Sequence, residues 1–325
     1  MITEALTHGV DERLDHGHPL EFAYFLTPDA TDAQGVLETA RLVDRLGYDL
    51  LGVQDHPYQP RHLDTSSLLA AILAQTTTVR FFAAVGNLPL RPPAVLAKSA
   101  ATLDLLSGGR FELGIGAGGF LEAAHAMGAE ARTPAESLAA LDEAIAVMRM
   151  MWSGERSPGL RFDGRYYQLA GVHPGPVPAH PIRIWIGANR PRALALTGRV
   201  ADGWVSPLMN YKPPRDAAEA NRAIDRAARA AGRDPSAIRR IYIIPGAITA
   251  RTGGPASDAD QAIVGPPEHW AKVLTHFATD LGFSTFVLAA PPDPPTLTAF
   301  AEDVAPLVRE RVAERRASVR ERAEA

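Results

Sequence analysis

An adjacent aspartate and histidine, Asp55 and His56, close an apolar run in the segment GVQDHPYQP. A histidine that points into a cleft titrates near neutrality, so it can donate or accept a proton beside a hydride acceptor. Asp55 would then orient His56 or bond a ring nitrogen of a cofactor, and His62 follows closely enough to line the same cleft. A loop histidine before a proline is more often structural, so both interpretations stay open on spacing alone.

A glycine cluster suggests a second reactive feature. The apolar run FELGIG leads into four glycines within six residues, at positions 114, 116, 118 and 119. A strand end without side chains suits a flat ligand that lies against the backbone, which predicts a cofactor site. The spacing also fits the dinucleotide fingerprint G-x-G-x-x-G, so a Rossmann domain competes with this interpretation, as do glycines that only turn the chain.

The segment IGANRPRALALTG suggests an anion site. Gly187 frees a strand end, Asn189 is suited to cap a helix, and Pro191 is suited to its first position. The amino terminus of a helix binds phosphate through unpaired amides and its dipole, and Arg190 or Arg192 would add charge. A plain capped helix is the alternative, and general grounds do not separate the two.

Composition limits the classes of function. The chain has 325 residues, 46% of them hydrophobic, which suffices for a sizeable α/β core. A net charge of −4 offers no basic field for nucleic acid, and no long apolar run predicts a membrane span. The absence of cysteine excludes disulfides and thiolate metal sites, and the histidines show no metal-ligand spacing, so no metal is predicted. The opening residues do not form a secretory signal, so a cytoplasmic protein is expected.

The elements that must position these residues recur as one unit: a helical pattern, a glycine stop and a short apolar strand. Eight candidate strands lie within 21–28, 44–56, 80–89, 106–119, 182–190, 198–207, 240–249 and 280–290. Eight strands alternating with helices predict a closed parallel barrel, a (β/α) eight-stranded TIM barrel, with the active site at the carboxyl ends of the strands. The fingerprint glycines lie mid-chain after several such units, which disfavours the Rossmann alternative.

Two segments break the pattern within one expected domain over 21–325, which follows an N-terminal extension over 1–20. An insertion over about 155–181 precedes the fifth strand, and its FDGRYY predicts a small hairpin. The carboxyl end, 295–325, predicts a long helix with a charge-dense tail. Such a tail is typical of solvated surface rather than of an interaction helix.

Five stretches together carry a resemblance: RLGYDLLGVQDH, the run from AAVGNLPLRPPAV to FELGIGAG, FDGRYYQL, PIRIWIGANRPRALALTGRVADGW, and IVGPPEHWAKVL with LGFSTFVLAA. As a set they resemble the bacterial luciferase-like oxidoreductase family over nearly the whole chain. The resemblance implies a (β/α) barrel with a hairpin insertion where one is expected. It also implies FMN or the deazaflavin coenzyme F-420 as cofactor.

The resemblance favours the deazaflavin. Asp55, His56 and Pro57, with Gln59 and Pro60 nearby, are similar to the pattern of deazaflavin-dependent dehydrogenases and reductases. In those enzymes the aspartate bonds the cofactor ring and the histidine is a proton donor, whereas flavin luciferases more often show Glu–His–His here. The resemblance therefore implies F-420, with FMN as the alternative.

Further cofactor contacts follow only from the resemblance. Ala84, Val85 and Gly86 correspond to a bulge that carries a non-proline cis peptide behind the cofactor ring in the family. The residues that match positions holding the cofactor's tail and phosphate are Ala117, Gly118, Asn189, Arg190, Arg192 and Ala193.

One departure from the family pattern concerns the substrate. In the sugar-phosphate dehydrogenases of the family the glycine cluster ends in a catalytic glutamate, whereas this chain continues Gly119, Phe120, Leu121. This departure disfavours oxidation of glucose-6-phosphate. An apolar wall at the barrel mouth instead suits a neutral, hydrophobic or conjugated substrate, and Glu122 is expected to be solvated.

These observations predict an oxidoreductase that transfers hydride between F-420 and a small, apolar organic substrate. An FMN-dependent monooxygenase that uses molecular oxygen and a separate flavin reductase is the first alternative, and a non-catalytic flavin-binding protein is the second. Neither nucleic acid nor membrane is an expected partner. A homodimer is expected from the resemblance and from how common twofold dimers are.

Overall fold

The strands of the main sheet are short runs of buried residues. In β2 (Leu50–Val53) and β5 (Phe111–Gly116) every residue is buried, as is typical of parallel strands that are covered on both faces. The computed structural model describes residues 14–154, 159–249 and 261–324. Parts of the expected N-terminal extension (1–13) and insertion (155–158) therefore lie outside the described residues.

All eight predicted strands are confirmed. They are β1 (Glu21–Leu26), β2, β3 (Arg80–Ala83), β5, β8 (Ile184–Gly187), β9 (Gly203–Leu208), β10 (Arg239–Ile248) and β12 (Thr285–Ala289). Their hydrogen-bonded order is β10-β12-β1-β2-β3-β5-β8-β9, with a further pairing of β10 with β9. This is the order of a (β/α) eight-stranded TIM barrel, so the Rossmann alternative is wrong.

Two short strands were not predicted as separate elements, although β4 lies within the run predicted over 80–89. β11 (Ile263–Gly265) pairs in parallel with the end of β10, and β4 (Gly86–Asn87) pairs with β5. Each has only two or three residues, too few for a hydrophobic period to be detected in the sequence.

A helix follows each barrel strand. The long helices are α1 (Ala33–Arg45), α2 (Thr65–Leu73), α3 (Pro93–Ser107), α5 (Pro134–Trp152), α6 (Pro191–Val200), α7 (Pro214–Ala230), α8 (Pro267–Thr279) and α10 (Ala305–Glu324). Local signals set their ends: Thr133 and Glu136 form a capping box before α5, and Gly108 ends α3 in the left-handed region. The predicted C-terminal helix is three segments, because α9 (Pro294–Ala299) and a π-helical turn (Phe300–Val304) precede α10.

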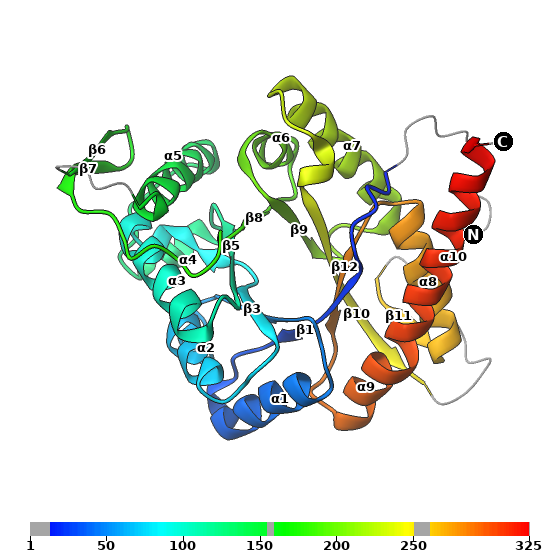
Figure 1. The fold of residues 1–325 in the computed structure, drawn as a ribbon. Coiled ribbons are helices and arrows are strands. Elements are labelled where there is room, and N and C mark those ends of the chain that lie inside the picture. Colours follow the sequence, from blue (N-terminus) through cyan, green and yellow to red (C-terminus); the bar gives the residue numbers. More distant parts are fainter. Residues whose placement is uncertain (1–13, 155–158, 250–260, 325) are drawn as a thin grey trace. The chain divides into compact units, whose positions relative to one another are not determined.

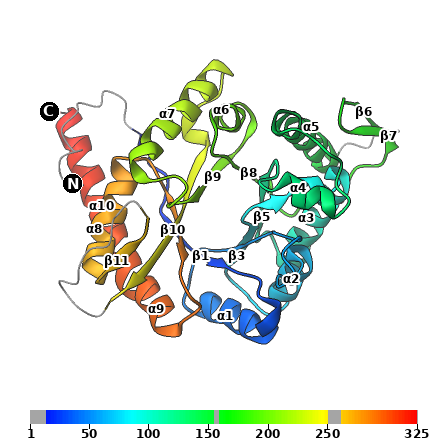
Figure 2. The ribbon, with the colours of Figure 1, turned by 180° about the vertical axis from the view of Figure 1, so that it is seen from behind.

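The chain divides into two compact units. Unit 2 comprises Phe25–Ala188 and Val200–Val205, and unit 1 comprises the described residues up to Tyr24, Asn189–Arg199 and the described residues from Ser206 onward. In unit 2, α2, α3 and α5 follow one another along the outside of their strands (Figure 1). In unit 1, α8 and α10 lie side by side (Figure 2). No helix in the described ranges has the length and apolar character needed to cross a membrane.

The predicted hairpin in the insertion is confirmed. β6 (Leu160–Asp163) and β7 (Gln168–Val172) pair antiparallel around the turn that contains Arg165, Tyr166 and Tyr167. The backbone N–H groups of these three residues all donate to the carboxylate of Glu143 on α5, at 2.9–3.1 Å. One acidic side chain therefore anchors the insertion to α5 within unit 2.

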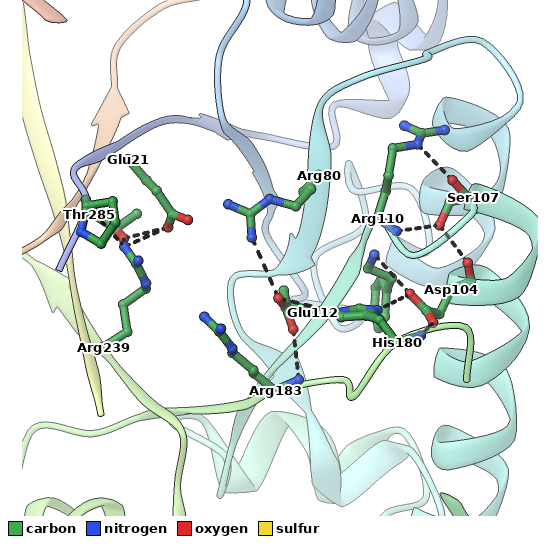
Figure 3. Close-up of polar contacts among 12 residues, drawn as sticks. Glu21, Arg80, Asp104, Ser107, Arg110, Glu112, His180, Arg183, Arg239 and Thr285 are labelled. Carbon is green, nitrogen blue, oxygen red and sulfur yellow. Dashed lines mark hydrogen bonds and ion pairs between the residues drawn. The ribbon is translucent and has the colours of Figure 1, made fainter. Parts of the chain in front are cut away.

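Polar side chains cluster where strands begin (Figure 3). In unit 2 the buried Glu112 on β5 accepts from the backbone N–H of Arg183 at 2.8 Å and lies 3.6 Å from Arg80. In unit 1 Arg239 pairs with Glu21 at 2.9 Å and donates to Thr285. Because the active sites of such barrels lie at the opposite, carboxyl ends of the strands, we assign these pairs to stability.

Asp44, near the end of α1, binds the segment that leads into β3. Its carboxylate accepts the backbone N–H groups of Thr77, Thr78 and Val79 and both threonine hydroxyls, at 2.7–3.2 Å. Burial alone would raise the pKa of Asp44, but these hydrogen bonds outweigh it and hold the pKa well below its ordinary value of 3.8.

Replacing Asp44 with alanine is expected to lower the free energy of unfolding by about 1.5 kcal/mol, because three amides lose a charged acceptor. A carboxyl with a depressed pKa stabilises the fold above its unfolded pKa, so this contribution is complete above about pH 5 and is lost as pH falls below about 4. Urea unfolding at pH 6 and pH 3 checks this expectation. Asp44→Ala should lose less stability than the unmodified protein between these pH values, and an equal loss would contradict the assignment.

Candidate functional site

The residue after β2 that the sequence singles out, Asp55, is only 3% exposed. Arg91 donates two parallel hydrogen bonds to the Asp55 carboxylate, from Nε to Oδ2 at 2.9 Å and from Nη2 to Oδ1 at 2.8 Å. The backbone N–H of Asn87 donates to Oδ2 at 2.8 Å. Among the described residues no hydrogen bond joins Asp55 to His56, so the direct orientation of His56 by Asp55 is not observed.

Arg91 extends this network to α2. Its Nη2 also donates to Oδ2 of Asp64 at 2.9 Å, and Asp64 is the N-cap of α2, accepting from the backbone N–H of Ser67. Burial opposes the charge of Arg91, but the two carboxylates outweigh it and raise its pKa further. Arg91 therefore ties the end of β2 to the start of α2, and sequence reasoning missed it because the pairing depends on loop geometry.

His56 lies in an aromatic cluster with Tyr58, His62 and Phe120. Nδ1 of His56 is 2.5 Å from the hydroxyl oxygen of Tyr58. The ring of Phe120 meets the His56 ring edge-on at 5.7 Å between centroids and the Tyr58 ring at 5.8 Å. Phe120 is 60% exposed although it touches both rings, so it presents an apolar surface beside the histidine.

The cluster keeps His56 neutral. Burial is the main cause that lowers the pKa of His56, and the neighbouring His62 adds to it, while Asp55 acts in the opposite direction. Burial, with a smaller effect of Asp55, raises the pKa of Tyr58 to about 12. At neutral pH the pair is therefore a neutral imidazole beside a neutral phenol.

The loop after β3 carries a non-proline cis peptide between Ala84 and Val85, as the resemblance implied for this bulge. The side chain of Val85 lies against two strand ends that have no side chains of their own. A Cβ on Gly187 would lie 2.7 Å from Cγ2 of Val85, and one on Gly116 would lie 3.0 Å from it.

These contacts give a different physical reason for the absence of side chains at these strand ends. Gly116 and Gly187 make room for Val85, and a Cβ on Gly114 would collide with the backbone carbonyl of Ala83. From the sequence, a flat ligand is predicted beside the cluster and an anion beside Gly187, whereas in the structure Val85 occupies the space next to both Gly116 and Gly187. Gly118, with φ of 101°, is the cluster member whose backbone conformation itself favours glycine.

The predicted anion site lies in unit 1. Pro191 is the first residue of α6, as predicted, and Arg190 is exposed just before it. Sequence reasoning missed Lys212, whose Nζ donates to the backbone carbonyl of Asn189 at 3.2 Å. Burial, followed by the repulsion of Arg190, lowers the pKa of Lys212 against the attraction of Asp216. Two cations thus meet at the amino terminus of α6, an arrangement that an anion would stabilise. Arg192 and Ala193 lie in its first turn.

Within unit 2 the structure brings together the strand-end residues that the sequence singled out: Asp55, His56, Ala84, Val85, Gly86 and Gly187 on or beside neighbouring strands, with Ala117 and Gly118 after β5. Buried polar atoms without partners suit an added ligand, and Nδ1 of His62 and Oδ1 of Asn87 are two such atoms. These two polar atoms, the exposed ring of Phe120 and the half-buried His56 fit a planar, polar-edged group. In the described part of the chain no cluster of three or more histidine, aspartate or glutamate side chains has the arrangement of a metal site.

Solved structures share the fold. An F-420-dependent secondary alcohol dehydrogenase, in complex with an F-420–acetone adduct, superimposes with a TM-score of 0.77 at 20% identity, covering 90% of this chain and 99% of that one. A long-chain alkane monooxygenase superimposes with a TM-score of 0.75 at 16% identity, covering 90% and 92%.

Sequence comparison identifies relatives more directly. An F-420-dependent glucose-6-phosphate dehydrogenase of Kineococcus radiotolerans is 33% identical over 197 residues, covering 58% of this chain and 57% of the relative. The chain thus matches less than two thirds of the relative's length. The model of the family described as luciferase-like monooxygenase matches residues 20–263, about three quarters of the chain. The protein therefore belongs to the luciferase-like monooxygenase family.

Proposed function

We propose that this protein is an oxidoreductase that transfers hydride between coenzyme F-420 and a small, apolar organic substrate. The observation that carries the proposal is His56, a neutral and half-buried histidine beside an exposed phenylalanine at the carboxyl end of β2. A bound deazaflavin would supply the hydride chemistry. His56 would give or take the proton that accompanies the hydride.

The proposal assigns the chain's residues to two tasks. Ala84, Val85 and Gly86, with Ala117, Gly118 and Gly187, would line the side of unit 2 on which the ring lies. Within unit 1, Asn189, Arg190, Arg192 and Ala193, together with Lys212, would form an anion site of the kind that binds a phosphate. Asp55 is held by Arg91 and Asn87, so we assign it first to the support of the strand ends and second to the cofactor ring.

The substrate class follows from Phe120. Neutral, hydrophobic or conjugated compounds suit its exposed ring. A glucose-6-phosphate dehydrogenase is among the relatives, but the absence of a glutamate after the glycine cluster weighs against sugar-phosphate oxidation in this chain.

FMN is the alternative cofactor, and the structural likeness to an alkane monooxygenase supports keeping it. In that case the protein would consume molecular oxygen and depend on a separate flavin reductase. The expected homodimer, cytoplasmic location and single-domain organisation stay predictions.

Fluorescence titration of the purified protein with oxidised F-420 and, separately, with FMN tests the cofactor. We expect saturable binding of F-420 at least about tenfold tighter than that of FMN, a difference of about 1.4 kcal/mol. A preference for FMN would overturn the proposal in favour of the two-component monooxygenase. Binding of neither oxidised cofactor would contradict both cofactor assignments for the oxidised state and would favour the reduced cofactor or a non-catalytic protein.

A further inference from the structure

The hydrogen bond between His56 and Tyr58 decides which nitrogen of His56 carries the proton. It joins Nδ1 to the phenolic oxygen at 2.5 Å, and the two rings are tilted by 49°. Phe120 packs against both rings, which restricts their rotation. Among the described residues Nε2 of His56 has no hydrogen-bond partner, so it is the nitrogen left for a ligand.

Proton affinity determines the direction of this bond. A phenol, with an ordinary pKa of about 10, is a far stronger acid than the N–H of a neutral imidazole, and the bare imidazole nitrogen is the stronger base. The groups that act on the pair are Asp55 and His62, and the pair is neutral under their influence. The favoured arrangement therefore has Tyr58 O–H donating to Nδ1.

We propose that Tyr58 is a positioning residue that holds His56 as the tautomer protonated on Nε2, so that His56 presents a proton donor to the oxygen of a carbonyl substrate. The inference rests on the proposed function and deepens it, because it names an aldehyde or ketone as the substrate that His56 would protonate. Tyr58 acts only through His56.

The proposed step reduces a carbonyl group to an alcohol. A bound reduced deazaflavin would supply the hydride to the carbonyl carbon and would itself be oxidised, and the carbonyl π bond would break as the new C–H bond forms. The carbonyl oxygen takes the proton from Nε2 and becomes a hydroxyl. Nδ1 takes the phenolic proton of Tyr58, so the imidazole stays neutral. Tyr58 is partly exposed, so its oxygen can regain a proton from solvent.

The test is a long-range ¹H–¹⁵N NMR spectrum of the full chain with ¹⁵N-labelled histidine, in which His56 is assigned by its loss in His56→Gln. The spectrum distinguishes a protonated from an unprotonated ring nitrogen without any cofactor or substrate. At pH 7.5 we expect a single His56 tautomer with Nδ1 unprotonated and Nε2 protonated. A His56 protonated on Nδ1, or a mixture of tautomers, would overturn the proposal.

Tyr58→Phe removes only the donor hydroxyl. The variant should lose the single tautomer and raise the pKa of His56 by about one unit, because a hydrogen bond to the neutral form is removed. Tyr167→Phe is the matched control, since it deletes the hydroxyl that Arg132 contacts in the same unit, and it should leave His56 unchanged. An unchanged tautomer in Tyr58→Phe would also overturn the proposal. Failure of the proposed function would appear in the F-420 titration, which does not depend on the tautomer.

Discussion

A variant with methionine in place of Arg91 is expected to lose about 3–5 kcal/mol of the free energy of unfolding, the usual cost of removing one partner of a buried ion pair. The Asp55 side chain is 2% exposed, and two of its hydrogen bonds come from Arg91. Methionine keeps an unbranched, flexible stem but leaves the Asp55 carboxylate with only the Asn87 amide. Urea unfolding followed by circular dichroism measures the loss.

Asp64→Asn is the matched control, because it alters the other carboxylate that Arg91 contacts. Asparagine caps a helix about as well as aspartate, so α2 keeps its N-cap. The Asp64 side chain is 46% exposed, and an exposed ion pair contributes at most about 1 kcal/mol. Similar losses in Arg91→Met and Asp64→Asn would contradict the assignment of Asp55 as the dominant partner.

A second substitution separates the buried charge from the shape of the side chain. In Asp55→Asn with Arg91→Met the carboxylate is absent, so no unpaired charge remains in the interior. The double variant should be more stable than Arg91→Met alone. A double variant that is less stable would mean that packing, rather than the unpaired carboxylate, determines the effect of Arg91.

The fold was largely predictable because its elements have local signatures. The barrel strands are buried apolar runs that end at glycine or polar residues, and α5 has its capping box and proline within the sequence that it caps. β11 was missed because three residues carry no period. The division into two units also has no local signature, since each unit combines segments from distant parts of the chain.

The candidate site was predictable in its positions but not in its pairings. The Asp55 and His56 side chains lie at a strand end, as expected, yet their partners are Arg91 and Tyr58. The bidentate contact between Asp55 and Arg91 joins residues 36 positions apart and depends on how two loops pack together. Residue types alone do not reveal that packing. Tyr58 was within reach of sequence reasoning, because it follows His56 by two residues.

The glycines at the strand ends lie where the sequence predicts, but the predicted reason for their missing side chains was incomplete. An absent side chain leaves space for any neighbour, and the sequence does not say which neighbour uses it. Val85 uses the space beside both Gly116 and Gly187. The two glycines therefore allow the Val85 side chain to take this position, and a ligand bound on this side would contact Val85.

Gly187→Ala is accordingly expected to cost about 3 kcal/mol of stability, the upper end for an overpacked site. The new Cβ would lie 2.7 Å from Cγ2 of Val85 and 3.3 Å from Cγ1. If the proposed cofactor lies against Val85, affinity for F-420 should also fall about tenfold. Thermal unfolding and the F-420 titration measure the two effects.

Truncating Val85 should reverse the effect of Gly187→Ala. In the double variant of Val85→Ala with Gly187→Ala, both Cγ atoms of residue 85 are gone, so the new Cβ at position 187 cannot collide with them. The double variant should therefore be more stable than Gly187→Ala alone. Such reversal between contacting residues is the non-additivity expected of a direct contact. Gly119→Ala is the control, because a Cβ on Gly119 meets nothing within 4 Å, and it should change neither stability nor binding. If Val85→Ala fails to rescue Gly187→Ala, the absent side chain at Gly187 serves the backbone or a ligand rather than Val85.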